Sequence, residues 1–227
     1  MRPRKFKDFW TRFWMHYAGL GFFGRIATRL ATWFAPPYYE RCYLARLNRK
    51  GYISPSATIH HSDLIIANNI FIGDHVVIYK DKDGGPVELG ERVHLYGETY
   101  IQTGQGGNVK IGRDTHIQPR CQFSAYKASI DIGRDVQIAP GCAFYPYDHG
   151  ILPDELICRQ PLTTKGDINI GDDVWLGFGV IVLSGVRIGK GAVIGAGSVV
   201  TRDAPEGAIA LGAPARVVRM RSDAADK

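Results

Sequence analysis

A period of six residues constrains the fold of this chain more than any other feature. An aliphatic residue recurs at every sixth position over a long segment, namely at Ile170, Leu176, Val182, Ile188, Ile194 and Val200. This period fits neither a helix, with 3.6 residues per turn, nor one continuous strand, with a period of two. It is typical of short strands joined by tight glycine-rich turns, each hexad forming one side of a prism with its aliphatic side chain inside.

The same register continues toward the N-terminus in four triplets of hexads. Their inward residues are Ile66, Ile72 and Ile78; Leu89, Leu95 and Ile101; Ile111, Ile117 and Phe123; Ile132, Ile138 and Phe144. Gaps of 11, 10, 9 and 26 residues follow the triplets. Because three hexads complete one turn, every insertion is predicted to leave the same corner of a six-coil column. Function concentrates in loops on rigid scaffolds, so we expect the site near the longest insertion, roughly residues 145–167.

The charge distribution divides the chain into two parts. Residues 1–50 contain 11 Lys and Arg but 2 Asp and Glu, whereas residues 51–227 contain 17 and 20, so the formal charges are +9 and −3. The first part also holds 13 of the 25 aromatic residues. We therefore predict a basic, aromatic-rich helical segment at 1–50, a repeat domain at 51–219 and a tail at 220–227.

The hexads and the closing run DDVWLGFGVIVLSGVRIGKGAVIGAGSVVTRDAPEGAIALGAPARVVR, residues 172–219, resemble the hexapeptide-repeat acyltransferases. Within that family the run is similar to the CoA-dependent O-acetyltransferases that act on maltose, galactosides and surface polysaccharides. The resemblance implies an all-β fold, a left-handed parallel β-helix with an N-terminal α-helical segment. It also implies acetyl-CoA as co-substrate, no metal, and a homotrimer with sites between subunits.

The resemblance assigns the catalytic base to His149, which lies in the longest insertion at the position of the family's loop histidine. Histidine suits this role because its ordinary pKa is about 6.5. Asp148 is a candidate to orient the ring, although adjacent side chains in a strand point in opposite directions. Asp131, Asp154 and Glu155 are equally good candidates.

Further site residues follow from the same matches. Gly177 and Phe178 match positions whose backbone amide approaches the thioester oxygen, and Ala196, Thr201, Arg202 and Arg216 match contacts to the pantetheine arm and phosphates of CoA. Trp175 matches a residue that lines the substrate cleft, and Tyr126, Lys127 and Tyr147 are expected to line the acceptor pocket.

The sequence leaves two alternatives to O-acetylation. N-acetylation of an amino sugar is an alternative to transfer onto a hydroxyl, and His94 and His116, predicted to stack on one outer face, leave a zinc-dependent carbonic-anhydrase-like protein as a weaker one. Cys121 and Cys142 share a small inward position and are predicted to be buried hydrophobic residues.

Aromatic residues at helical spacing predict amphipathic helices before Pro36, formed by Phe6, Phe9, Trp10, Phe13, Trp14 and Tyr17, and then by Phe22, Ile26, Leu30 and Trp33. Such helices either lie on an anionic membrane surface, through residues 1–37, or cover the open end of the prism. We expect a cytoplasmic protein. If residues 1–37 bind a membrane, we expect the protein to lie on the inner face of the cell membrane. The expected acceptor is a sugar or glycolipid, and no nucleic-acid partner is expected, since no recognition motif accompanies the basic charge.

Overall fold

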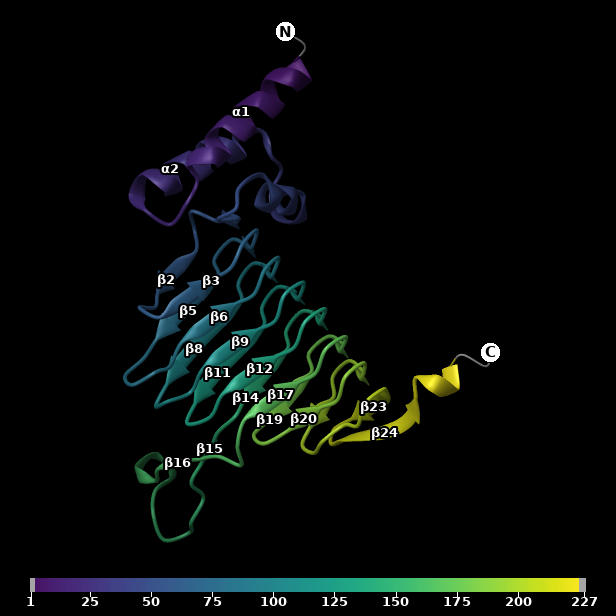
Figure 1. The fold of residues 1–227 in the computed structure, drawn as a ribbon. Coiled ribbons are helices and arrows are strands. Elements are labelled where there is room, and N and C mark those ends of the chain that lie inside the picture. The colour runs from purple at the N-terminus through teal and green to yellow at the C-terminus, as the bar shows by residue number, and fades with distance from the viewer. Residues whose placement is uncertain (1–2, 225–227) are drawn as a thin grey trace.

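The computed structural model describes residues 3–224 and consists of a column of parallel coils with helices at one end (Figure 1). The fold is the expected left-handed parallel β-helix. Residues 1–2 and 225–227, which belong to the predicted terminal segments, lie outside the described residues.

Three sheets form the sides of the column, and we name them A, B and C in the order in which the chain visits them. Sheet A contains β1 (Tyr52–Ile53), β4 (Phe71–Ile72), β7 (His94–Leu95), β10 (His116–Ile117), β13 (Gln137–Ile138), β18 (Trp175–Leu176), β21 (Val193–Ile194), β23 (Ala208–Gly212) and β24 (Ala215–Met220). Sheet B contains β2 (Thr58–His60), β5 (Val77–Lys80), β8 (Tyr100–Gly104), β11 (Gln122–Tyr126), β14 (Ala143–Tyr145), β19 (Ile181–Leu183) and β22 (Val199–Val200). Sheet C contains β3 (Leu64–Ile66), β6 (Val87–Leu89), β9 (Val109–Ile111), β12 (Ile130–Ile132), β17 (Ile168–Ile170) and β20 (Arg187–Ile188).

The six-residue period has its predicted structural meaning. The inward residue of each hexad lies beside the residue at the equivalent position of the next coil, as Leu95 lies beside Ile117. Together these side chains form one continuous buried core. Cys121 and Cys142 are fully buried in this core, as predicted. The last pair of sheet A differs, because β24 runs antiparallel to β23.

The column has one coil more than the six that the sequence predicts, since sheet B contains seven strands. The additional coil comes first and places Ile53 and Ile59 in or against the core. Ile59 and Ile66 are seven residues apart, so a search for a strict period of six misses this coil.

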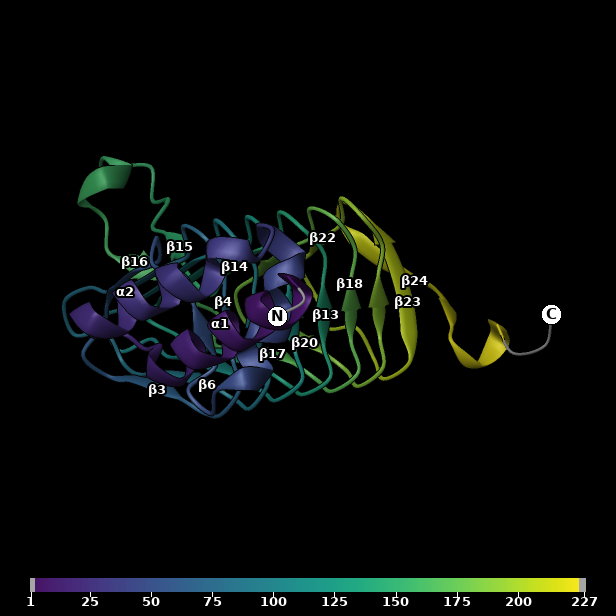
Figure 2. The ribbon, with the colours of Figure 1, turned by 90° about the horizontal axis from the view of Figure 1, so that it is seen from above.

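All four insertions leave the column where the chain passes from sheet B to sheet C, which we call the B–C corner. The longest one contains a small hairpin of β15 (Asp148–His149) and β16 (Leu162–Thr163), and the 3₁₀ helix η3 (Ile157–Arg159). This loop projects away from the body of the column (Figures 1 and 2).

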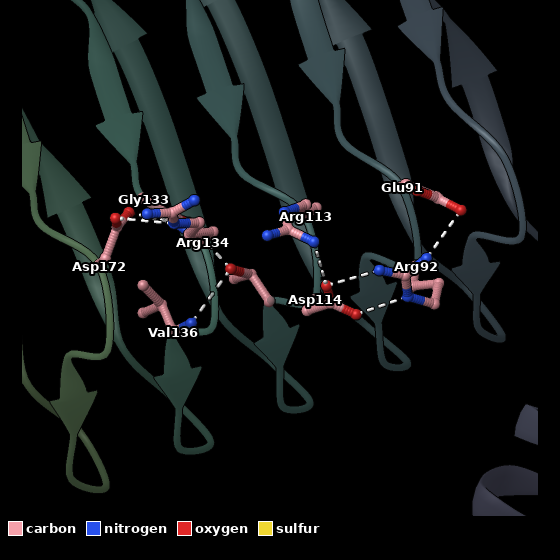
Figure 3. A network of polar contacts seen from close by, with 9 residues as sticks. Glu91, Arg92, Arg113, Asp114, Gly133, Arg134, Val136 and Asp172 are labelled. Carbon is pink, nitrogen blue, oxygen red and sulfur yellow. Dashed lines mark hydrogen bonds and ion pairs between the residues drawn. The ribbon is translucent and has the colours of Figure 1, made fainter.

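A ladder of charged and polar groups connects the coils at the corner between sheets C and A (Figure 3). Arg92 donates two hydrogen bonds to Asp114, at 2.6 and 2.7 Å. One coil further on, Arg134 binds Asp172 at 2.9 Å. The Arg92 guanidinium lowers the pKa of the Asp114 carboxyl. These contacts fix the vertical register of successive coils at an exposed edge.

The N-terminal segment forms α1 (Pro3–Tyr17), α2 (Phe22–Ala31) and the 3₁₀ helices η1 (Thr32–Phe34) and η2 (Tyr38–Leu47), and a further 3₁₀ helix, η4 (Ser222–Ala224), follows β24. The N-terminal helices lie over the first end of the column (Figure 2). Met15, Ala31 and Leu44 are buried in one cluster with Tyr52 and Phe71 of sheet A. Because Ile53 and Ile72, the neighbours of Tyr52 and Phe71, point into the core, this cluster lies against the outer side of sheet A at this end.

The aromatic face of α1 is divided between two environments. Trp10 and Trp14 pack inward, and the Trp10 indole nitrogen donates to the Leu30 carbonyl at 2.7 Å. Phe9 and Phe13 are exposed, with ring centroids 6.2 Å apart. Thus only part of the apolar surface of these helices is buried by packing, and the part that contains Phe9 and Phe13 is exposed. Among the residues that the structure describes, no helix combines the length and apolar character needed to cross a membrane.

Candidate functional site

His149 is held at the base of the projecting loop, on the short strand β15. This strand pairs with β16, with Asp148 opposite Thr163 and His149 opposite Leu162. The His149 side chain is exposed, and within residues 3–224 no hydrogen bond to its ring is present. The ring is therefore accessible from solvent, while the hairpin fixes the backbone that carries it.

The loop beyond His149 is organised by one buried amide. The Gln160 side chain accepts a hydrogen bond from the Leu152 N–H at 2.8 Å and donates to the carbonyls of Leu152 and Glu155, at 2.8 and 2.7 Å. Four aliphatic side chains of the loop remain mostly exposed, namely Ile151, Leu152, Leu156 and Ile157. The sequence analysis did not identify Gln160, because its partners lie five and eight residues away in an irregular segment.

Asp148 has a different partner from the one considered in the sequence analysis. Its Oδ2 accepts a hydrogen bond from the Ser184 hydroxyl at 2.9 Å. Ser184 lies at the same corner, one coil further toward the C-terminus. Asp148 therefore ties β15 to the next coil, and its carboxylate is not directed at the His149 ring.

Asp131, another acid proposed to orient His149, also has other surroundings. Asp131 lies on β12 of sheet C, beside Lys110 and Asn169. Burial, followed by the charge of Asp167, raises the pKa of Asp131. In the loop, the backbone carbonyl of Glu155 accepts a hydrogen bond from the side-chain amide of Gln160.

Tyr126 and Tyr147 lie next to the histidine corner, on the outer side of sheet B. Their ring centroids are 5.5 Å apart, and the Tyr147 hydroxyl is 3.5 Å from the Ser124 hydroxyl. The Tyr126 hydroxyl donates to Asp81 and accepts from the Gln102 amide at 2.6 Å. Burial and the Asp81 carboxylate raise the pKa of Tyr126, which keeps the phenol neutral. Lys127 is exposed in the adjoining turn.

Trp175 is exposed on β18 of sheet A. In a triangular column, the B–C corner is opposite sheet A. His149 and Trp175 of one chain are therefore on different sides of the molecule, and a single protomer does not bring them together.

Gly177, Phe178 and Ala196 stack at the corner between sheets A and B. The Gly177 N–H donates to the Ile194 carbonyl at 2.8 Å, and a Cβ on Gly177 would lie 2.6 Å from the Ala196 nitrogen. Gly177 is thus required by the contact between coils, and its amide is already paired. The Phe178 N–H donates to no backbone carbonyl among the described residues, so the expectation of an amide facing the thioester now rests on Phe178.

Two of the predicted CoA contacts meet at the C-terminal end of the column. Arg202 and Arg216 line one cavity of about 130 Å³, together with Asp203 and Val217. Thr201 is exposed beside Arg202. Two guanidinium groups at one cavity fit the phosphates of a nucleotide cofactor, because each presents a planar fork of donors.

His94 and His116 stack on sheet A as predicted, with ring centroids 4.4 Å apart. Burial, followed by the charges of His116 and Arg46, lowers the pKa of His94 to about 4. The next residues on this ladder are Gln137 and Trp175. Over the described part of the chain, no group of three or more His, Cys, Asp or Glu side chains is arranged to hold a metal ion.

Comparisons with known proteins agree with this architecture. Residues 167–202 match the family model described as bacterial transferase hexapeptide (six repeats). Residues 167–202 thus carry the hexapeptide repeat of bacterial transferases, and they lie within the parallel β-helix.

The chain is similar to a Mycobacterium tuberculosis protein named "Probable acetyltransferase Rv3034c", with 32% identity over 163 residues. The match covers 70% of this chain and 52% of that protein, so the chain spans about half the length of this relative.

Among solved structures, the chain is similar to AntD, an N-acyltransferase from Bacillus cereus in complex with dTDP and coenzyme A. The TM-score is 0.55 at 19% identity, covering 75% of this chain and 80% of AntD. It is also similar to NeuO, the polySia-specific acetyltransferase, with a TM-score of 0.54 at 22% identity, covering 74% of this chain and 82% of NeuO. At these identities the two structures show the fold alone.

Proposed function

We propose that this protein transfers an acetyl group from acetyl-CoA to a sugar hydroxyl, with His149 as the general base. The observation that carries the proposal is the exposed His149 on a hairpin-fixed strand, beside a tyrosine-lined surface of sheet B. The similarity to acetyltransferases and to a CoA-bound acyltransferase supports the choice of reaction.

The chemistry follows from these groups. Acetyl-CoA supplies an acyl group activated as a thioester. His149 takes the proton from the acceptor hydroxyl as its oxygen attacks the acyl carbon, and later returns that proton to the departing thiolate. The Phe178 N–H is the candidate donor for the oxyanion, while Arg202 and Arg216 bind the CoA phosphates. No covalent acetyl-enzyme is expected, since among the described residues no Ser hydroxyl or Cys thiol forms a hydrogen bond with the His149 ring, and the exposed Cys158 forms none either.

We infer that the site is assembled between neighbouring protomers of a homotrimer. His149 at the B–C corner and Trp175 on sheet A can line one cleft only if two chains contribute them. The exposed aliphatic tip of the long loop supports the same arrangement, because it offers an apolar contact to a neighbouring column.

The test is a thioester-release assay with acetyl-CoA and a panel of sugars. We expect His149→Ala to lower kcat by about 10²–10⁴, the usual contribution of a positioned base, while acetyl-CoA binding measured by calorimetry stays near the wild-type value. The matched control is His75→Ala, which removes an exposed histidine from a different corner. A His149→Ala variant that retains more than a tenth of the wild-type rate assigns the base to another residue.

Transfer to an amino-sugar nitrogen is the second candidate. Its support is the likeness in fold to AntD, which is described as an N-acyltransferase. Paired acceptors that differ only in a hydroxyl or an amine at one carbon separate the two reactions. We expect product from the hydroxyl member of each pair, and product from the amine alone would replace our proposal with this second one.

We further propose that the N-terminal helices hold the protein on the inner face of the cell membrane, where a lipid-linked sugar precursor serves as acceptor. Phe22, Phe23 and Trp33 are 75%, 82% and 71% exposed. A groove of about 460 Å³ beside them is lined by Arg25 and Arg29 as well as apolar side chains. Aromatic rings and guanidinium groups together suit an interface that contains anionic lipid.

Because the helices also bury part of the core, point substitutions test this proposal better than deletion of residues 1–37. We expect Phe22→Ser/Phe23→Ser to lower binding to vesicles of phosphatidylglycerol and phosphatidylcholine, with sedimentation as the readout. Wild-type binding should weaken in high salt and on pure phosphatidylcholine. The control Ile65→Ser changes a similarly exposed residue on sheet C. Equal binding of both variants would contradict the membrane proposal.

A further inference from the structure

The outer side of sheet B carries a continuous polar and aromatic surface below the candidate site. We call it the tyrosine face and define it by Tyr79, Tyr100, Gln102, Gln122, Tyr126 and Tyr145. These residues come from β5, β8, β11 and β14, four consecutive strands of the sheet (Figure 1). The face leads from the coils near the N-terminal helices to β14, which continues into the hairpin of His149.

Hydrogen bonds between side chains fix the positions of five of these six residues, all but Tyr79. The Tyr100 hydroxyl donates to Gln102 at 3.1 Å, and Gln102 in turn donates to Tyr126 at 2.6 Å. The Tyr145 hydroxyl donates to Gln122 at 2.7 Å. A surface ordered in this way loses little conformational freedom when a ligand binds.

The composition of the face selects one kind of ligand. Phenol rings offer flat apolar surfaces with a polar edge, while amides and hydroxyls both donate and accept hydrogen bonds. The six defining residues carry no formal charge at neutral pH, because they are phenols and amides, and the Asp81 carboxylate at the edge of the face accepts a hydrogen bond from Tyr126. A neutral chain of sugar rings, apolar on its faces and hydroxylated around its edge, matches this pattern.

The length of the face indicates more than one sugar unit. Three steps separate β5 from β14, and at about 4.8 Å per coil they span roughly 14 Å, which is longer than a single hexose ring.

We infer that the tyrosine face binds a neutral oligosaccharide chain along the column and presents one unit of it to His149. This inference rests on the proposed function and specifies its acceptor as an extended glycan. Tyr79, Tyr100 and Gln102, which the sequence analysis did not single out, become residues that determine preference for acceptor length.

The test measures binding in the absence of acetyl-CoA, so that it does not depend on turnover. The probes are methyl glycosides of one, three and six units in glucose, galactose and N-acetylglucosamine series, and the readout is ligand line broadening with the full chain. We expect affinity to increase with length in at least one series. In Tyr79→Ala/Tyr100→Ala, binding of the six-unit probe should weaken roughly three- to tenfold per ring removed, and the one-unit probe should be unaffected.

Two control variants keep the result interpretable. Tyr79→Phe/Tyr100→Phe retains the rings and should retain most of the length preference. Tyr43→Ala removes a tyrosine that is 50% exposed on η2, away from sheet B, and should change nothing. Sedimentation of each variant reports the oligomeric state, and a change of mass in the sheet B variants alone would show the face to be a subunit contact and overturn the inference.

The inference and the proposed function fail in different ways. If short acceptors are acetylated but no series binds more tightly with length, the tyrosine face is not a glycan site and the proposed function stands. If binding increases with length but no acceptor is acetylated, the face is supported and the proposed function fails.

Discussion

At the scale of single residues, Gly104 shows how closely one coil approaches the side chains of the next. A Cβ at this position would lie 2.4 Å from Cε1 of Tyr126. The Tyr126 ring therefore lies directly over the Gly104 backbone, and its hydroxyl reaches Asp81 and Gln102 from there. Glycine is needed at position 104 because any side chain would collide with the Tyr126 ring, and not because of the backbone conformation of a turn.

We predict that Gly104→Ala displaces the Tyr126 ring and breaks its two hydrogen bonds. The free energy of unfolding should fall by about 1–2 kcal/mol, as measured by urea denaturation. Gly19→Ala is the control, because the one atom near the added methyl group, Cδ of Lys50, lies at an ordinary contact distance of 3.9 Å and the φ of Gly19 is not positive. Equal stability of Gly104→Ala and wild type would show that the ring moves aside at no cost.

Individual contacts within the candidate site were harder to predict from sequence than the corner at which the insertions leave the column. His149, Tyr126 and Tyr147 lie at or beside one corner because insertions can leave only where three hexads are complete. The bond between Ser184 and Asp148 joins residues 36 positions apart, across an insertion whose internal structure has no period. Sequence spacing therefore located the corner but could not assign the partners within it.

At the scale of elements, the long loop depends on the buried amide of Gln160. We predict that Gln160→Ala loosens residues 151–159 and increases their rate of limited proteolysis by at least roughly tenfold, since three hydrogen bonds to the backbone are lost. Glu155→Ala is the matched control, because its backbone carbonyl, which the loop uses, is retained. Similar cleavage of both variants would mean that other contacts order the loop.

The N-terminal helices illustrate the limits of helical periodicity. The spacing of the aromatic residues predicted one apolar face on α1, and the helix forms as expected. The buried side of α1 is shifted from that face, because Thr11 and Met15, which lie outside it, are buried, whereas Phe9 and Phe13, which belong to it, are exposed. A single-helix pattern gives the width of an apolar face but not the angle at which a second helix covers it.

At the scale of the whole molecule, the positions of His149 and Trp175 on different sides of the column predict complementation between subunits. His149→Ala and Trp175→Ala are each expected to be nearly inactive. Refolding them together at equal concentration should restore activity at about a quarter of the sites, because a mixed interface can combine both native residues. A mixture as inactive as its components would place the complete site within one protomer.

The pH dependence of stability also depends on contacts between coils of the column, such as the ion pair of Arg92 and Asp114. Since Arg92 lowers the pKa of Asp114, this carboxylate stabilises the folded state at pH values above the ordinary value of about 3.9, and the contribution disappears as pH falls through the lowered pKa. We predict that Asp114→Asn lowers the urea midpoint at pH 7 and that its difference from wild type narrows below about pH 4. A difference that is constant with pH would exclude the ion pair as its cause.

The two ends of the column are closed by different means, and this bears on self-association. Parallel coils of identical shape could stack end to end without limit, as strands do in a fibril. At the first end, the helical segment lies over the coil that begins with β1. At the other end, β24 reverses direction against β23 and places Arg216 and Arg219 on the outermost strand of sheet A. At this end, a second column therefore finds no matching parallel strand on sheet A to continue.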